Sequence, residues 1–300
     1  MENKDQEKVT SKKGWFDKHY KLLMILPIIL LICSLIYLGL FYSKNKDFII
    51  KDISLSGGTT VTLHGELDYD HIENLLTEKN SDISFRKLTE LRTGKTIALI
   101  IESSSSAEEL IKELEDILGY KLTNDNSSIE FTGSSLSGSF YNQLIMALII
   151  SFILMSIVIF ILFRTFIPSI AVIFAAFADI VMPLALINFL GIKVSAAGIA
   201  AFLMLIGYSV DTDILLTTRA IRTHEGTLNN RIYRAFKIGI LMTLTALFAV
   251  LPAFFLITGL PDSFRQIFLI LAIGLVADII NTWLTNVGII KWYCEKHNIK

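Results

Sequence analysis

The chain has 300 residues, of which 53% are hydrophobic and 18% are charged, and its mean hydropathy is +0.58. This composition excludes a water-soluble domain of this size, so a lipid bilayer must be the solvent for much of the chain. The formal net charge of -1 excludes the basic field of a nucleic-acid-binding protein, and two cysteines, Cys33 and Cys294, are too few for a disulfide framework. We expect two free thiols and no nucleic-acid partner.

Six apolar stretches are long enough to cross about 30 Å of hydrocarbon as helices. They span residues 22–42, 140–163, 167–190, 194–218, 238–257 and 268–290. The first could be taken for a signal peptide, but Ser43-Lys44-Asn45-Lys46 is no small-residue cleavage site. We therefore interpret it as an uncleaved membrane anchor.

The distribution of Lys and Arg orients these spans. Six basic residues lie in residues 1–21, five in residues 219–237 and three in residues 291–300, whereas the opposite short loops hold only Lys193 and Arg265. Since cytoplasmic loops carry the excess of positive charge, we expect both termini in the cytoplasm of a multi-pass protein of the cytoplasmic membrane. Residues 43–138 are then extracytoplasmic, and residues 139–290 hold spans two to six.

The extracytoplasmic region alternates between strand-like and helix-like patterns. The predicted order is strand 59–63, helix 70–79, strands 83–90 and 96–102, helix 107–118 and strand 128–132. This order is the split βαβ, or ferredoxin-like, α+β arrangement. The region has no Cys/His cluster, P-loop or nucleophile elbow, so we expect no metal, no cofactor and no catalytic residue.

Four aspartates fall within the predicted spans, at positions 179, 211, 213 and 278. An ionisable group at the bilayer centre costs at least about 2.5 to 3.5 kcal/mol, so each needs a structural or functional reason. Counted from the cytoplasmic ends, Asp179, Asp211 and Asp278 lie roughly 12 to 20 Å deep. We expect these three to share one layer of the membrane.

The sixth span carries a polar stripe on an otherwise apolar helix. The stripe follows i, i+3, i+4, i+7, i+8 and comprises Asp278, Asn281, Thr282, Thr285 and Asn286. One face of this helix must therefore contact protein or water instead of lipid. A purely structural role in interhelical hydrogen bonds is the alternative to an ion pathway.

In the fourth span, Asp211 and Asp213 point about 200° apart, so they cannot both face one narrow site. We favour Asp211, which is deeper and shares its face with Gly207 and Tyr208. Buried acids with few bases nearby are suited to a proton relay. The alternative for Asp213 is an ion pair with the arginines at positions 219 and 222.

The run Gly-Tyr-Ser-Val-Asp-Thr-Asp at residues 207–213, followed by Arg-Ala-Ile-Arg, resembles the fourth-span signature of SecF proteins in the SecD/SecF family. Bacterial members carry Gly-Tyr-Ser-Val-Asn-Asp-Thr, and the Asp-x-Asp form resembles the archaeal branch. The acidic position of the bacterial signature thus corresponds to Thr212 here. The aspartate at that position is linked to proton movement in the family, so the resemblance implies that Asp211 or Asp213 has this role here.

Three further segments resemble motifs of the same family. They are the stretch around Gly57 and Gly58 after the first span, the stretch from Gly133 to Gly138 before the second, and Ala178-Asp179-Ile180 in the third. A glycine pair at the start of a first strand permits a turn or a close backbone approach.

The resemblance implies half of a transporter of the resistance-nodulation-division type. It implies pairing with SecD, action near the Sec translocon channel on a translocating polypeptide, and coupling to the proton-motive force across the lipid bilayer. Alternatives are a lipid or small-molecule exporter half of the same superfamily and a non-transporting scaffold or sensor. An intramembrane aspartyl protease is disfavoured because no Tyr-Asp and Gly-x-Gly-Asp pair is present.

Overall fold

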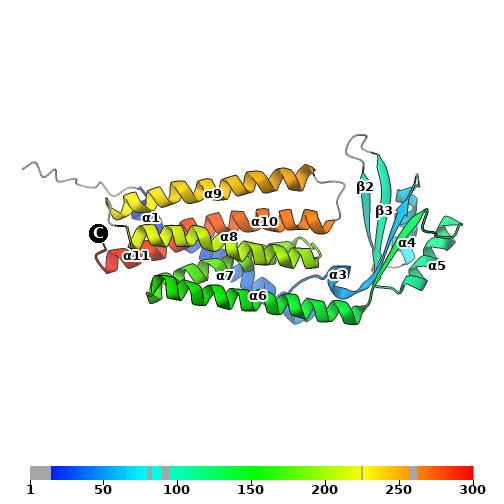
Figure 1. Ribbon diagram of the computed structural model, residues 1–300, viewed down its shortest axis with the longest axis horizontal. Helices are drawn as coiled ribbons and strands as arrows, with labels where there is room; N and C mark the ends of the chain where they lie inside the picture. Colours follow the sequence, from blue (N-terminus) through cyan, green and yellow to red (C-terminus); the bar gives the residue numbers. More distant parts are fainter. Residues whose placement is uncertain are drawn as a thin grey trace, which may run out of the picture.

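The computed structural model describes residues 15–65, 67–79, 83–89, 95–223, 226–256 and 262–299. Residues 1–14 of the predicted N-terminal segment 1–21 thus lie outside the described residues. A bundle of long helices carries a small sheet at one end, and the C-terminus lies at the other end (Figure 1). We call these the domain end and the terminal end of the bundle.

Six helices are long and apolar enough to cross a membrane, as predicted. The long helices are α2 (Ile25–Asn45), α6 (Ser134–Phe163), α7 (Phe166–Phe189), α8 (Ala196–Ile221), α9 (Leu228–Leu256) and α10 (Asp262–Ile280). Shorter helices are α1 (Trp15–Leu23), α3 (Ile53–Ser56) and α11 (Val287–Lys296), and a π-helical segment, η1 (Asn281–Asn286), joins α10 to α11. The expected fold class, a six-span helical bundle with a small α+β region, is confirmed.

Several helices begin before the predicted start of their span, because an apolar window detects only the part of a helix that suits lipid. Helix α9 begins at Leu228, ten residues before the predicted start of its span. Its first three turns carry basic residues, so an apolar window does not include them. Helix α6 begins at Ser134, so the Gly133 to Gly138 motif forms its first turn.

The small domain contains β1 (Gly58–His64), α4 (Tyr69–Lys79), β2 (Ile83–Thr89), β3 (Thr96–Ser103), α5 (Ala107–Leu118) and β4 (Ser127–Thr132). The sheet order is β2-β3-β1-β4, and every neighbouring pair is antiparallel. This is the predicted ferredoxin-like arrangement. Helices α4 and α5 pack on one face, where Val61, Leu63 and Ile101 are fully buried.

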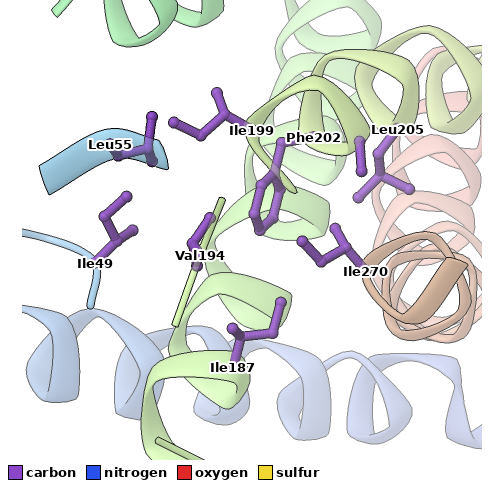
Figure 2. Packing of buried hydrophobic residues seen from close by; sticks show 9 residues of the cluster. Ile49, Leu55, Ile187, Val194, Ile199, Phe202, Leu205 and Ile270 are labelled. Carbon is purple, nitrogen blue, oxygen red and sulfur yellow. The ribbon is translucent and has the colours of Figure 1, made fainter. Parts of the chain in front are cut away.

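A second apolar core joins the small domain to the bundle. Leu55 of α3 and Ile49 of the preceding segment pack beside Val194, Phe202 of α8 and Ile270 of α10 (Figure 2). Next to this apolar contact, the backbone N–H of Asp52 donates a hydrogen bond to the carbonyl of Val194. The path from α2 to the sheet is thus fixed against the domain end of the bundle.

The six long helices divide into a central and an outer group. In the span-forming windows of α7 and α8, 56% of residues are buried inside the protein, and 44% are buried in the window that includes α10. The corresponding shares are 17% in α2, 6% in α6 and 11% in α9. The central helices therefore form the interior of the bundle, and the outer helices face lipid or a partner.

Candidate functional site

Three aspartates from the three central helices meet inside the bundle. Asp179 of α7, Asp213 of α8 and Asp278 of α10 are each fully buried. Among the described residues, no Lys, Arg or His forms an ion pair with any of them. Burying ionised carboxylates without cations is very costly, so hydrogen bonds must satisfy this site.

Asp179 is held by two donors from different helices. The Ser209 hydroxyl of α8 donates to its Oδ2, and Asn281 Nδ2 of η1 donates to its Oδ1 at 2.6 Å. Because both carboxyl oxygens are engaged, Asp179 ties α7 to α8 and to η1. Hydrogen bonds of this kind hold transmembrane helices together where lipid supplies no hydrophobic driving force.

Asp278 and Asp213 are bridged by one hydroxyl. Thr282 Oγ1 lies 3.0 Å from Asp278 Oδ1 and 2.9 Å from Asp213 Oδ1. Thr212 Oγ1 lies 2.9 Å from Asp278 Oδ1 and 2.8 Å from the Ser209 carbonyl oxygen, and Thr243 Oγ1 of α9 lies 3.3 Å from Asp278 Oδ2 and 3.2 Å from the Gly239 carbonyl oxygen. Each of these hydroxyls therefore has one proton for two acceptors. Asn286 Nδ2 donates to Asp213 Oδ1 at 2.6 Å.

A count of protons indicates how this bridge works. A threonine hydroxyl donates one hydrogen bond and can accept others, so Thr282 cannot donate to both aspartates at once. If Thr282 donates to one carboxylate, the other carboxyl must donate to Thr282, which requires that it carries a proton. Asp213 Oδ2 has no hydrogen-bond partner among the described residues. The geometry therefore fits a pair of carboxyl groups that share a proton through Thr282.

The π-helical segment lies at this site. Residues 281–286 depart from the regular helix that the sequence predicts for the whole sixth span. Asn281 of this segment contacts Asp179, while Thr282 and Asn286 contact Asp213. Single-turn π segments occur frequently at functional sites because they redirect side chains within a helix.

The preference for Asp211 over Asp213 as the residue that faces the site with Asp179 and Asp278 does not hold. Asp211 is exposed on the surface of this chain, whereas Asp213 is fully buried. Two residues along a helix turn about 200°, so only one of the pair can face α7 and α10. Depth along the helix favoured Asp211, but rotation about the helix axis places Asp213 in the site.

The alternative pairing of Asp213 with arginine is also wrong. The partners of Asp213 are Thr282 and Asn286. Arg222 instead donates to the backbone carbonyl of Leu162 at the end of α6. The Arg222 guanidinium thus binds a carbonyl at the C-terminal end of α6 and does not neutralise Asp213.

The predicted polar stripe is largely confirmed. Asn281, Thr282 and Asn286 join Asp278 in the network, whereas Thr285 is buried without a hydrogen-bond partner among the described residues. Tyr208 is half-buried on α8, and its hydroxyl lies beside Thr243 and makes no hydrogen bond to a carboxylate among the described residues. Thr285 and Tyr208 therefore do not hold the carboxylates.

Three hydroxyl residues of the network, Ser209, Thr212 and Thr243, are not among the predicted site residues. A single serine or threonine in an apolar span by itself gives no signal in the sequence. The hydroxyls of Thr212 and Thr243 contact Asp278. The one available signal for Thr212 was its position between the two acids of the fourth-span motif.

The predicted glycines have different surroundings. A Cβ on Gly57 would lie 2.5 Å from Ser134 Cα, and one on Gly58 would lie 2.4 Å from the Ser103 carbonyl oxygen. Both also have positive φ, of 82° and 144°, which favours glycine. The pair thus permits the close approach of β1 to α6 and β3. Apart from the adjacent residues and the backbone of the same helix, no atom lies within 4 Å of a Cβ built on Gly133, Gly138 or Gly207.

Among the described residues, no group of three or more His, Cys, Asp or Glu is arranged to hold a metal ion. Cys33 and Cys294 are both free, as expected.

Comparisons with known proteins agree with these features. The family model "Protein export membrane protein SecD/SecF, C-terminal" matches residues 114–296. A SecF protein of Methanolacinia petrolearia is 36% identical over 92% of this chain and 94% of its own length. The SecF protein of Methanocaldococcus jannaschii is 33% identical over 94% of this chain and 99% of its own length.

The fold is also similar to a solved structure. The crystal structure of SecDF from Thermus thermophilus, described as a translocon-associated membrane protein, matches 95% of this chain with a TM-score of 0.69 and 17% sequence identity. This chain spans 39% of that protein. Because the family model covers more than half of the chain and the SecF relatives cover almost all of it, the chain belongs to the SecD/SecF family of protein-export membrane proteins.

Proposed function

We propose that this chain is the SecF-type subunit of a protein-export complex in the cytoplasmic membrane. It pairs with a SecD-type subunit and acts near the translocation channel on a polypeptide in transit. Family membership supports this role. The pairing is supported by the SecDF structure, in which the region similar to this chain is 39% of one longer protein. In this role the chain is a component of the export machinery and not an enzyme.

The proposed orientation has both termini in the cytoplasm and the ferredoxin-like domain outside. The excess of Lys and Arg in residues 219–237 and 291–300 supports it. In this orientation the sheet domain is available to a polypeptide that leaves the channel.

The buried carboxylate network is the proposed coupling site for the proton-motive force. The observation that carries this proposal is the bridge from Asp213 through Thr282 to Asp278, which has no cation among the described residues. A proton that moves from one carboxyl to the other changes which partner Thr282 donates to. Such a change alters the hydrogen bonds between α8 and the segment α10–η1, and it can thereby couple proton transfer to helix movement.

Asp213 and Asp211 provide a matched test. We would measure export of a reporter protein in cells whose only copy of this subunit is wild type, Asp213→Asn or Asp211→Asn. Asn keeps the size of the side chain but cannot carry the titrating proton. We expect Asp213→Asn to reduce the export stimulated by this subunit at least about tenfold, which corresponds to roughly 1.4 kcal/mol. Asp211→Asn should retain most of it.

Membrane levels of each variant and co-purification with the SecD-type partner would serve as controls. Normal stimulation by a well-assembled Asp213→Asn protein would refute the relay. Failure of the wild-type chain to co-purify with a SecD-type protein would refute the pairing.

A further inference from the structure

Two cavities meet at the domain end of the bundle, and their chemistry differs sharply. The first has a volume of about 340 Å³ and lies between the sheet and the helix ends. The second has a volume of about 890 Å³ and lies along α2, α7, α9 and α10. Phe254 and Leu269 line both cavities, so the two are adjacent.

The larger cavity is an apolar groove in the membrane-spanning part of the bundle. Its lining includes Tyr37, Leu186, Leu251 and Phe255. Along α10 it extends from Leu269 to Ile280, which corresponds to roughly 16 Å at 1.5 Å per residue. This length is about half of the roughly 30 Å hydrocarbon core, or one leaflet of the bilayer. A groove of this length and composition matches an acyl chain of the leaflet at the domain end.

The smaller cavity carries charges of both signs. Lys193 and Arg265 contribute two cations, and Asp52 and Glu102 contribute two carboxylates. Neither cation forms an ion pair within the described residues. Arg265 lies over the ring of Phe254, with 4.8 Å between its guanidinium carbon and the ring centroid, so its charge is at the junction of the two cavities.

The wall of the smaller cavity is fixed by Gln266. Its Oε1 accepts from the Ser195 backbone N–H at 2.8 Å and from the Ser195 hydroxyl at 2.6 Å. Its Nε2 donates to the carbonyl of Lys193. The start of α10 is thereby held against the start of α8, which fixes the backbone from which Lys193 and Arg265 extend.

We propose that the two cavities together bind one phospholipid with a zwitterionic head group. One acyl chain of the lipid occupies the apolar groove, the other lies in the bilayer, and the phosphate lies at Arg265 and Lys193. A guanidinium and an ammonium are the usual protein partners of phosphate. The ammonium group of the head lies toward Glu102 and Asp52, which disfavour a head group of net negative charge. Each cavity by itself is within the range of small-molecule sites, about 300 to 1,000 Å³.

Native mass spectrometry of the purified full chain in detergent tests this site. The probes are three lipids with identical acyl chains: a phosphatidylethanolamine, a phosphatidylglycerol and a diacylglycerol without phosphate. We expect one phosphatidylethanolamine per chain, bound about tenfold more tightly than either of the other two. Soluble glycerophosphoethanolamine should not displace it, because the head alone lacks the chain that fills the groove.

Two pairs of variants separate the head-group contacts from the groove. The double variant Lys193→Gln/Arg265→Gln should weaken phosphatidylethanolamine binding about tenfold and leave diacylglycerol binding unchanged, whereas Lys237→Gln, at an exposed cation far from the site, should change neither. Leu251→Trp, which fills the groove, should weaken all three lipids equally. Phe248→Trp, on the same helix but outside the groove, is its matched control.

Equal affinity for phosphatidylethanolamine and diacylglycerol would overturn the head-group assignment, and tighter binding of phosphatidylglycerol would overturn the zwitterionic assignment. Unchanged binding in a folded Leu251→Trp protein would overturn the groove. Should that variant not fold, the charge variants at the cavity mouth still test the proposal. Retention of no phospholipid by the wild-type chain would overturn it entirely.

Discussion

The central and outer helices of this bundle show opposite relations between hydropathy and burial. Helix α6 lies in the most apolar span, with a mean hydropathy of 3.1, yet only 6% of its window is buried inside the protein. Helix α8 lies in the least apolar span, at 1.7, and 56% of its window is buried. In a soluble protein the more apolar helix would be the more buried one.

The solvent explains this difference. Lipid is as apolar as leucine, so burying an apolar side chain between helices gains little, whereas exposing a carboxyl to lipid is costly. The polar groups therefore gather among α7, α8 and α10, where Asp179, Asp213 and Asp278 find donors. Hydrogen bonds join the central helices, and the outer helices present their apolar faces outward.

The largest expected effect comes from placing a carboxyl on an outer helix. Ile153 lies near the middle of the α6 span and is 52% exposed. We expect Ile153→Asp to cost about 2.5 to 3.5 kcal/mol in membrane insertion. A glycosylation-based insertion assay on the full chain measures this cost, with Ile153→Leu as the control. Normal insertion of the Asp variant would mean that this face of α6 does not contact lipid.

The next effect concerns the close contact of α9 with the segment that follows α10. A Cβ on Gly239 would lie 2.3 Å from a ring carbon of Trp283, whereas a Cβ on Gly39 in α2 would meet no atom within 4 Å. We expect Gly239→Ala to destabilise the protein by about 1 to 3 kcal/mol. Gly39→Ala should be neutral or slightly stabilising. Unfolding in mixed micelles compares the two, and equal effects would contradict the distinction.

A smaller effect is expected from removing the bridging hydroxyl. Thr282→Val keeps the shape of the side chain but removes its contacts with Asp213 and Asp278. Hydrogen bonds between transmembrane helices average about 0.6 kcal/mol and reach about 1.7, and we expect a loss in this range. The control is Thr245→Val, because that exposed hydroxyl donates to the Leu241 carbonyl of its own helix. Both variants can be compared by the same unfolding measurement.

The smallest effect concerns Asp47, which follows α2. Asp47 accepts from the Tyr141 hydroxyl of α6 at 2.6 Å and forms an ion pair with Lys51 at 2.6 Å. Partial burial alone would raise the pKa of Asp47, but the hydrogen bonds from Lys51 and Tyr141 outweigh it and lower the pKa from its ordinary value of 3.8.

The sign of the pH effect follows from this lowered pKa. Stability from Asp47 is present above pH 3.8 and is lost as the pH falls through the lower pKa of the folded state. At pH 7 we expect Asp47→Asn to be less stable by under about 1 kcal/mol, since the ion pair is partly exposed. The difference between the two proteins should shrink in acid and in high salt. A difference that grows below pH 3.8 would contradict this assignment.

The amino-acid sequence by itself determined the elements of this protein. Spans follow from the length of apolar runs, and the order of strands and helices in the small domain follows from periods of two and 3.6 residues. The polar stripe on the sixth span was also readable, because a helix fixes the angles between its own residues. The glycine pair at Gly57 and Gly58 was recognisable as a position of either a turn or a close approach.

Only the tertiary structure decided which face of α8 enters the site. A helical period states that Asp211 and Asp213 point apart, but it does not state which of them faces α7 and α10. Packing of the three central helices set that rotation and selected Asp213. The bridge by Thr282 and the contribution of Thr243 likewise required the relative positions of separate helices, which no single helix encodes.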